Sequence, residues 1–183
     1  MKNLALARRY AKALLLIGKE DGQMDTYRRE LESVCSVFQE NDNLRQILSN
    51  PLYARAARRQ ILETVVQKLD LSRVMQSFLL LLFDKGRVER LKDVERSYQQ
   101  LADAFQNIAR AQITSAVALG DAAVEGIRAA LVRMTNRDVV LAVDEDPRII
   151  GGIVTKVGDL VYDGSIRTQL RNLRESFKRG EGI

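Results

Sequence analysis

The spacing of apolar residues changes once along the chain, and this change constrains the fold more than any other feature. Through residue 105 apolar residues recur every three or four positions, the period of helices with one buried face. Beyond residue 110, short β-branched runs alternate with helical stretches. The pattern predicts a mainly α protein, with a helical bundle at residues 1–105 and a small α+β domain at 106–183.

Six helices are predicted in the first part. They span about residues 3–20, 24–40, 42–48, 51–69, 73–85 and 88–108. Asn50 is expected to cap the fourth helix, with Pro51 as its first residue. Ser72 is the expected N-cap of the fifth helix, and Gly86 its end.

The fifth predicted helix is apolar on nearly every side between Val74 and Phe83. Such a helix is either central or lends one face to a partner. Together with the first helix it could form a groove for an amphipathic helix of another protein. Alternatively, both helices are simply part of the bundle core, and the pattern alone favours this second interpretation.

The C-terminal part predicts four short strands and two helices. The strands are expected at 111–119, 138–143, 149–157 and 160–162, and the helices at 122–135 and after a cap at Asp163–Ser165. Gly151 and Gly152 fall inside the third strand, where paired glycines indicate a bulge or a close backbone approach. Gly158 and Asp159 suit a tight turn.

The residue inventory excludes most site chemistry. The chain has no histidine and one cysteine, Cys35, so His-dependent catalysis, an internal disulfide and a Cys-based zinc site are excluded. The Gly151–Lys156 stretch lacks the Gly-Lys-Ser/Thr ending of a phosphate loop. The acidic Asp144–Asp146 turn lacks EF-hand spacing. We therefore expect no catalytic residue, cofactor or metal.

Charge leaves one alternative open. Residues 1–105 carry 18 Lys and Arg against 14 Asp and Glu. An RNA-associated helical binding protein is therefore the second hypothesis, and it predicts affinity that falls steeply with salt. The basic pairs Arg8-Arg9, Arg28-Arg29 and Arg58-Arg59 are interleaved with acids, which favours solvated helix faces instead.

Several stretches resemble one known family, in order along the whole chain. They are Ala7–Leu14; Asn50-Pro51 ahead of Ile61-Leu62; Phe78–Leu82 with Lys85-Gly86-Arg87; and Asp146–Ile153 with Val157-Gly158-Asp159 and Asp163–Arg167. The family is the delta subunit of F-type ATP synthase, whose mitochondrial counterpart is the oligomycin-sensitivity-conferring protein. The last stretch resembles the family's C-terminal signature nearly throughout.

The resemblance implies a non-catalytic stator of the peripheral stalk, which links the F1 catalytic head to membrane-anchored b-type subunits so that rotor torque drives ATP synthesis. It implies a six-helix N-terminal bundle whose first and fifth helices bind the N-terminal helix of an alpha subunit. The groove residues carried over are Tyr10, Ala11, Leu14, Phe78, Leu79 and Leu82. The domain marked by Gly151 and Gly152 would contact the b-type stalk.

The resemblance also implies further partners and a location. Other F1 subunits are expected partners, whereas nucleic acid and direct membrane insertion are not. The longest apolar run, Phe78–Phe83, is far shorter than the ~20 residues that span a membrane. We expect a peripheral position on the cytoplasmic face of a bacterial inner membrane, because no cleavable leader precedes the first helix. A processed organellar protein would look the same.

Overall fold

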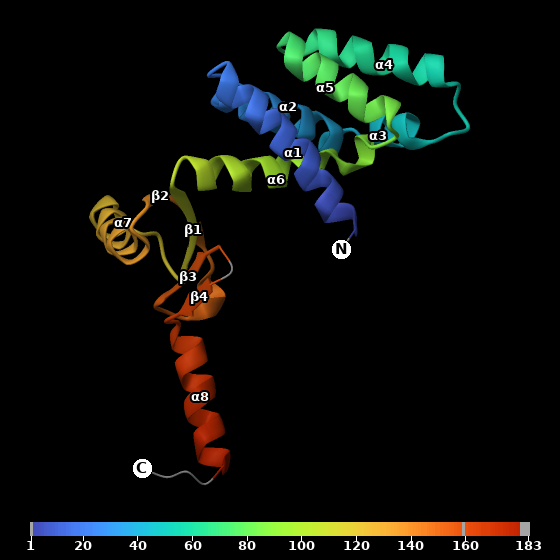
Figure 1. The fold of residues 1–183 in the computed structure, drawn as a ribbon. Helices are drawn as coiled ribbons and strands as arrows, with labels where there is room; N and C mark the ends of the chain where they lie inside the picture. Colours follow the sequence, from blue (N-terminus) through green and yellow to red (C-terminus); the bar gives the residue numbers. More distant parts are fainter. Residues whose placement is uncertain (1, 159, 180–183) are drawn as a thin grey trace. The chain divides into compact units, whose positions relative to one another are not determined.

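The computed structural model describes residues 2–158 and 160–179, and it divides the chain into two compact units (Figure 1). The first unit ends at Ala102, whereas the sequence pattern placed the boundary after residue 105. The first unit is helical and the second combines helices with a sheet. The expected mainly α fold with a small C-terminal α+β part is therefore confirmed.

The first unit is built from consecutive helices joined by short turns. In chain order they are α1 (Lys2–Glu20), α2 (Met24–Glu40), α3 (Asp42–Ser49), α4 (Arg55–Lys68), α5 (Arg73–Asp84), the 3-10 turn η1 (Val88–Arg90) and α6 (Leu91–Phe105). Each helix buries one stripe of apolar residues, as the sequence period predicted.

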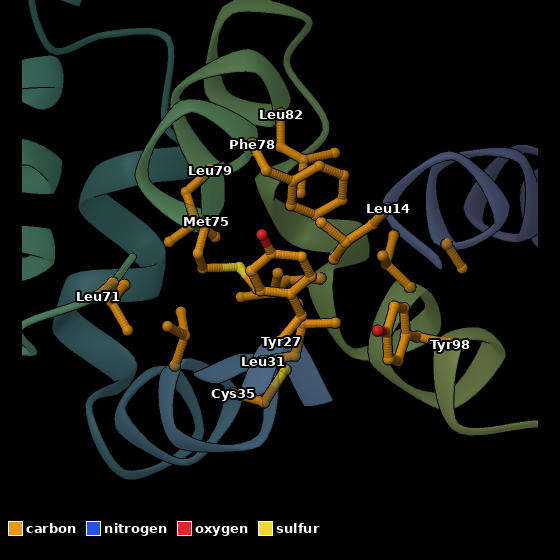
Figure 2. Packing of buried hydrophobic residues seen from close by; sticks show 14 of the residues in the cluster. Leu14, Tyr27, Leu31, Cys35, Leu71, Met75, Phe78, Leu79, Leu82 and Tyr98 are labelled. Carbon is orange, nitrogen blue, oxygen red and sulfur yellow. The ribbon is translucent and has the colours of Figure 1, made fainter. Parts of the chain in front are cut away.

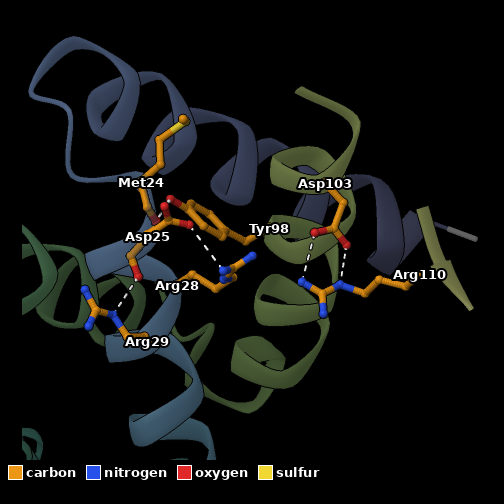
Figure 3. Close-up of polar contacts among 7 residues, drawn as sticks. All are labelled: Met24, Asp25, Arg28, Arg29, Tyr98, Asp103 and Arg110. Carbon is orange, nitrogen blue, oxygen red and sulfur yellow. Dashed lines mark hydrogen bonds and ion pairs between the residues drawn. The ribbon is translucent and has the colours of Figure 1, made fainter. Parts of the chain in front are cut away.

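The core of the first unit is formed mainly by α1, α2, α5 and α6 (Figure 2), and Leu48 of α3 and Leu62 and Val66 of α4 complete it. Its fully buried side chains include Leu14, Leu31, Met75 and Leu82. Burial of each such side chain contributes about 1.5–3 kcal/mol. The buried Tyr98 hydroxyl donates to the Met24 carbonyl oxygen at 2.9 Å, which satisfies the polar group of this ring inside the core (Figure 3).

The start of α4 differs from the prediction. The helix begins at Arg55, and the segment that begins with Asn50 and Pro51 is a turn. The Asn50 side-chain oxygen accepts from the Leu52 backbone N–H at 3.0 Å, and the Asn50 carbonyl accepts from Tyr53 N–H. An Asn side chain can accept from a backbone N–H in a turn as readily as at the start of a helix. Here Asn50 forms the turn and does not cap α4.

Both predicted ends of α5 are confirmed. The Ser72 hydroxyl accepts from the Met75 backbone N–H at 3.2 Å, as an N-cap does. Gly86 has a φ of +64°, the left-handed conformation that lets the chain leave the helix.

The second unit is a sheet with α7 packed on it. Its elements are β1 (Ile108–Ser115), α7 (Asp121–Thr135), β2 (Asp138–Glu145), the 3-10 turn η2 (Pro147–Ile149), β3 (Ile153–Val157), β4 (Leu160–Asp163) and α8 (Ile166–Arg179). Among the described residues the sheet order is β2-β1-β3-β4, with β1 and β2 parallel and the other pairs antiparallel. Leu131 of α7 packs with Ala109, Ala111 and Val139 to form the small core.

The first strand begins earlier than predicted. The sixth helix ends at Phe105 and β1 begins at Ile108, a residue that the pattern assigned to the helix. Asn107, with a φ of +57°, makes the turn between them. Arg110 then donates to both Asp103 carboxylate oxygens, at 2.6 and 3.0 Å (Figure 3). This bidentate pair fixes the end of the helix to the strand.

The prediction that Gly151 and Gly152 lie inside a strand is wrong. Strand β3 begins at Ile153, and both glycines lie in the bend between η2 and β3. The close backbone approach that the paired glycines indicated does occur, because a Cβ on Gly152 would overlap the Gly164 carbonyl oxygen. The turn expected at Gly158 and Asp159 lies partly outside the described residues, since Asp159 is not among them.

Candidate functional site

A groove of about 400 Å³ lies on the surface of the first unit between α1 and α5. Its lining is Leu14, Ile17, Arg73, Val74, Ser77, Phe78 and Leu81. All of these except Arg73 and Ser77 are apolar. We call this surface the α1/α5 groove.

The helical period explains how two segments distant in sequence build the α1/α5 groove. Leu14 and Ile17 are three residues apart on α1, and Val74, Phe78 and Leu81 follow intervals of four and three on α5. Residues at these intervals share one helix face. The Tyr10 ring packs edge-on against Phe78, with ring centroids 6.4 Å apart and planes at 74°.

The groove has a buried floor and exposed apolar edges. Leu14 and Phe78 are buried and form the floor, and Figure 2 shows them beside one another. Ile17 is 42% exposed and Leu81 is 45% exposed, although both are large aliphatic residues. An apolar concave surface of this kind gains free energy when another apolar surface covers it.

The six groove residues expected from the resemblance divide into two groups. Leu14 and Phe78 line the groove, and the half-buried Tyr10 packs on Phe78. The structure places the other three in the core instead. Those three, Ala11, Leu79 and Leu82, are buried and, unlike the equally buried Leu14, are not part of the groove lining.

Sequence reasoning missed most of the exposed lining. Ile17, Val74 and Leu81 were not predicted, nor were the two polar residues Arg73 and Ser77. A second apolar stripe on α5 could have indicated part of this lining from the sequence. Met75, Leu79 and Leu82 form one stripe that faces the core, and the stripe ending at Leu81 lies on the groove side.

Two buried groups whose pKa is strongly raised, Tyr98 and Cys35, lie outside the groove and are held protonated. Burial raises the pKa of Tyr98 to about 12 and that of the Cys35 thiol to about 12. Neither group supplies a nucleophile or base at neutral pH in that state. In residues 2–158 and 160–179, no cluster of three His, Cys, Asp or Glu residues could hold a metal ion. No helix in the same ranges is long and apolar enough to cross a membrane.

A second apolar surface follows α8 in the second unit. Its members are large, exposed and spaced at intervals of four, three and four: Ile166, Leu170, Leu173 and Phe177. We call this row the α8 stripe.

The expected marker residues Gly151 and Gly152 lie at the base of α8. The Ile166 backbone N–H donates to the Gly151 carbonyl oxygen at 2.9 Å. Ser165 caps the helix by accepting from Thr168 N–H at 3.2 Å. Asp163 accepts from Ser165 N–H and from the Thr168 hydroxyl, and these hydrogen bonds lower the Asp163 pKa. The glycines therefore fix where the α8 stripe begins.

Known proteins resemble this chain over its whole length. The family model described as ATP synthase delta (OSCP) subunit matches residues 6–177. A protein named ATP synthase subunit delta from Desulfatibacillum aliphaticivorans is 54% identical over the whole of both chains. One of the same name from Desulforapulum autotrophicum is 49% identical over 99% of each.

Solved structures share the fold. A chain in the cryo-EM structure of the Toxoplasma gondii mitochondrial ATP synthase hexamer aligns with a TM-score of 0.69, covering 94% of this chain and 97% of that one at 20% identity. A chain in a Polytomella F-ATP synthase structure aligns with a TM-score of 0.51 over 54% of this chain and 87% of that one, at 22% identity. At these identities the likeness concerns the fold alone.

Proposed function

The chain belongs to the ATP synthase delta (OSCP) subunit family, and from that premise we propose that its α1/α5 groove binds the N-terminal helix of an alpha subunit. The resemblance seen in the sequence is confirmed by this membership. The chain is a peripheral-stalk component of F-type ATP synthase, a structural subunit and not the catalytic one. Other ATP synthase subunits are its partners.

The observation that carries the groove proposal is the exposure of Ile17 and Leu81 above a buried apolar floor. An amphipathic helix places apolar anchors at i, i+3, i+4 and i+7, which matches a groove between two helices. Covering apolar surface contributes about 25 cal/mol per Å². A part that resists torque requires a contact that dissociates slowly, and apolar burial favours one.

We assign the second contact to the α8 stripe. Its four exposed apolar residues lie on one helix face and fit the C-terminal ends of b-type stalk helices. Ile150, exposed and held at a φ of +70°, precedes the glycines that fix the base of α8. A β-branched residue rarely adopts this conformation, and such strain concentrates at functional sites.

The membrane face belongs to the same proposal. In a bacterium whose F-type head makes ATP for the cell interior, the subunit lies peripherally on the cytoplasmic face of the inner membrane. The family membership supports the peripheral position on the complex.

The ion pairs of α4 count against the RNA-binding alternative. Arg55 of α4 pairs with Asp84 at 2.8 Å, and Arg59 pairs with Glu63 at 3.0 Å. A basic surface used for phosphate binding would leave such cations free.

A peptide titration tests the groove proposal. The full-length chain is titrated calorimetrically with a synthetic peptide of about 25 residues, or about seven helical turns, from the N-terminus of the alpha subunit of the same organism. We expect micromolar or tighter binding with weak salt dependence. Ile17→Asp should weaken it at least tenfold, because a carboxylate would enter an apolar contact.

Leu16→Asp is the matched control. Leu16 neighbours Ile17, is 50% exposed and is not part of the groove lining. It should leave affinity nearly unchanged, with equal helix content in both variants by circular dichroism. Absence of binding to the unmodified chain, or equal losses in the two variants, would refute the groove proposal.

A further inference from the structure

Arg73 is the one charged residue among the seven that line the α1/α5 groove. It is the first residue of α5 and is exposed. The rest of the lining is apolar apart from Ser77. A single cation in an apolar groove is a specific feature that an occupant must accommodate.

The Arg73 side chain has no ion pair or hydrogen bond with any residue in ranges 2–158 and 160–179. Several other arginines of the first unit do pair with carboxylates. Arg55 and Arg59 contact Asp84, at 2.8 and 3.6 Å, and Arg45 contacts Asp42 at 2.6 Å. Arg73 therefore presents its full set of donors to whatever occupies the groove.

The position of Arg73 is also electrostatically unfavourable for α5 itself. The N-terminal end of a helix carries partial positive charge, so a cation in the first turn is unfavourable there. No acidic residue lies in the first turn of α5 itself, but a carboxylate from α2, that of Glu30, accepts from the Ser72 N–H and hydroxyl at 2.7 and 2.8 Å at this end. Arg55 occupies the same position in α4, but its pairing with Asp84 accounts for its presence. Glu30 bonds to the capping Ser72 and forms no ion pair with Arg73 among the described residues.

We propose that the helix bound in the groove carries a carboxylate that pairs with Arg73, and that this pair fixes the register of the bound helix. This inference rests on the proposed helix-binding function of the groove. A guanidinium binds a carboxylate through two parallel hydrogen bonds, while its methylene stem lies on apolar surface. Apolar contacts along the stripes give affinity but allow the bound helix to shift along the groove. The ion pair fixes its position.

The geometry of α5 gives the spacing of this carboxylate. Arg73 and Leu81 are eight residues apart on one helix, which is about 12 Å at 1.5 Å per residue. A helix lying along the groove therefore places its acidic residue about two turns from the apolar residue that packs on Leu81. The partner is thus an amphipathic helix with one acid on, or at the edge of, its apolar face.

A double-mutant cycle tests the pair. The full-length chain and its Arg73→Met variant are titrated with the alpha-subunit peptide, and with peptides in which each Glu or Asp is replaced in turn by Gln or Asn. Arg73→Met keeps much of the apolar stem but removes the charge. We expect Arg73→Met to weaken binding about threefold to tenfold. One peptide substitution should cause the same loss and add nothing when combined with Arg73→Met.

Arg96→Met is the control, because Arg96 is exposed on α6 and does not line the groove. It should leave affinity unchanged, and the Arg73→Met loss should shrink as salt rises. Equal affinities of the unmodified and Arg73→Met chains would overturn the inference. So would a loss that couples to no peptide carboxylate, which would indicate pairing with helix carbonyls.

The two proposals fail in different ways. Loss of binding in Ile17→Asp together with no effect of Arg73→Met would leave the groove function standing and overturn only the register pair. Absence of peptide binding to the unmodified chain would overturn both.

Discussion

Gly152 lies where only glycine fits. Its φ is +77°, and a Cβ there would overlap the Gly164 carbonyl oxygen. The Gly164 N–H donates to the Ile153 carbonyl oxygen at 3.0 Å, so the two segments have little freedom to separate. The base of α8 depends on this close approach.

Gly152→Ala should therefore destabilise the second unit by at least about 2 kcal/mol. Native-state hydrogen exchange of the β1 amides measures this, because it reports the opening of that sheet. Gly126→Ala in α7 is the control, since a Cβ at Gly126 meets nothing within 4 Å. It should stabilise the unit by about 0.5–1 kcal/mol. Equal effects of the two substitutions would contradict the account of Gly152.

Tyr98 predicts how stability responds to alkaline pH. Burial raises its pKa to about 12, above the ordinary value of 10. The unfolded chain therefore releases this proton first. The stabilisation that comes from the raised pKa of Tyr98 is fully present below pH 10. It is lost as pH rises from 10 towards 12, at up to about 1.4 kcal/mol per pH unit.

Urea unfolding between pH 9 and 12 measures this response. Tyr98→Phe should cost about 1 kcal/mol at pH 7, because the hydrogen bond to the Met24 carbonyl is lost. The variant should then lose stability less steeply than the unmodified chain above pH 10. Parallel curves through this range would show that Tyr98 does not control the response.

At the scale of elements, α5 shows what the sequence could predict. Its existence, its cap at Ser72 and its end at Gly86 follow from local chemistry and are confirmed. The sequence does not show which face of α5 points to the core, because both of its stripes are apolar and have the same helical period. Only the packing of the other helices of the unit, α4 included, decides that Leu79 and Leu82 face the core.

Other misses have similar causes. Asn50 was predicted to cap a helix, but its side chain accepts from Leu52 N–H in a turn, and sequence does not choose between these local bonds. Ile108 fits both the helical stripe of α6 and the alternation of β1. Pairing of β1 with β2, a contact between distant segments, determines that it is a strand residue.

The two faces of α5 predict unequal costs of truncation. Leu82 is fully buried, so Leu82→Ala should destabilise the first unit by about 2–5 kcal/mol. Leu81→Ala should cost less than about 1 kcal/mol, because Leu81 is 45% exposed on the groove edge. Urea unfolding followed by circular dichroism compares them. Similar losses would mean that Leu81 belongs to the core.

At the scale of the whole molecule, each unit carries an exposed apolar surface suited to a helix. The α1/α5 groove lies in the first unit and the α8 stripe in the second. The residue inventory, with no histidine and a single buried cysteine, suits a part that transmits force and catalyses nothing. Rotation of the central shaft exerts torque on the catalytic head, and a peripheral-stalk subunit must resist it.

The most direct test of this account is ATP-driven proton pumping. Membrane vesicles are prepared with the F-type ATP synthase of the same organism but without this chain, and pumping is followed by quenching of a pH-sensitive dye. We expect ATP hydrolysis to continue while pumping is lost. Added unmodified chain and Leu16→Asp should restore pumping, and Ile17→Asp should not. Full pumping without the chain, or restoration by Ile17→Asp equal to that by the unmodified chain, would contradict a stator role that depends on the α1/α5 groove.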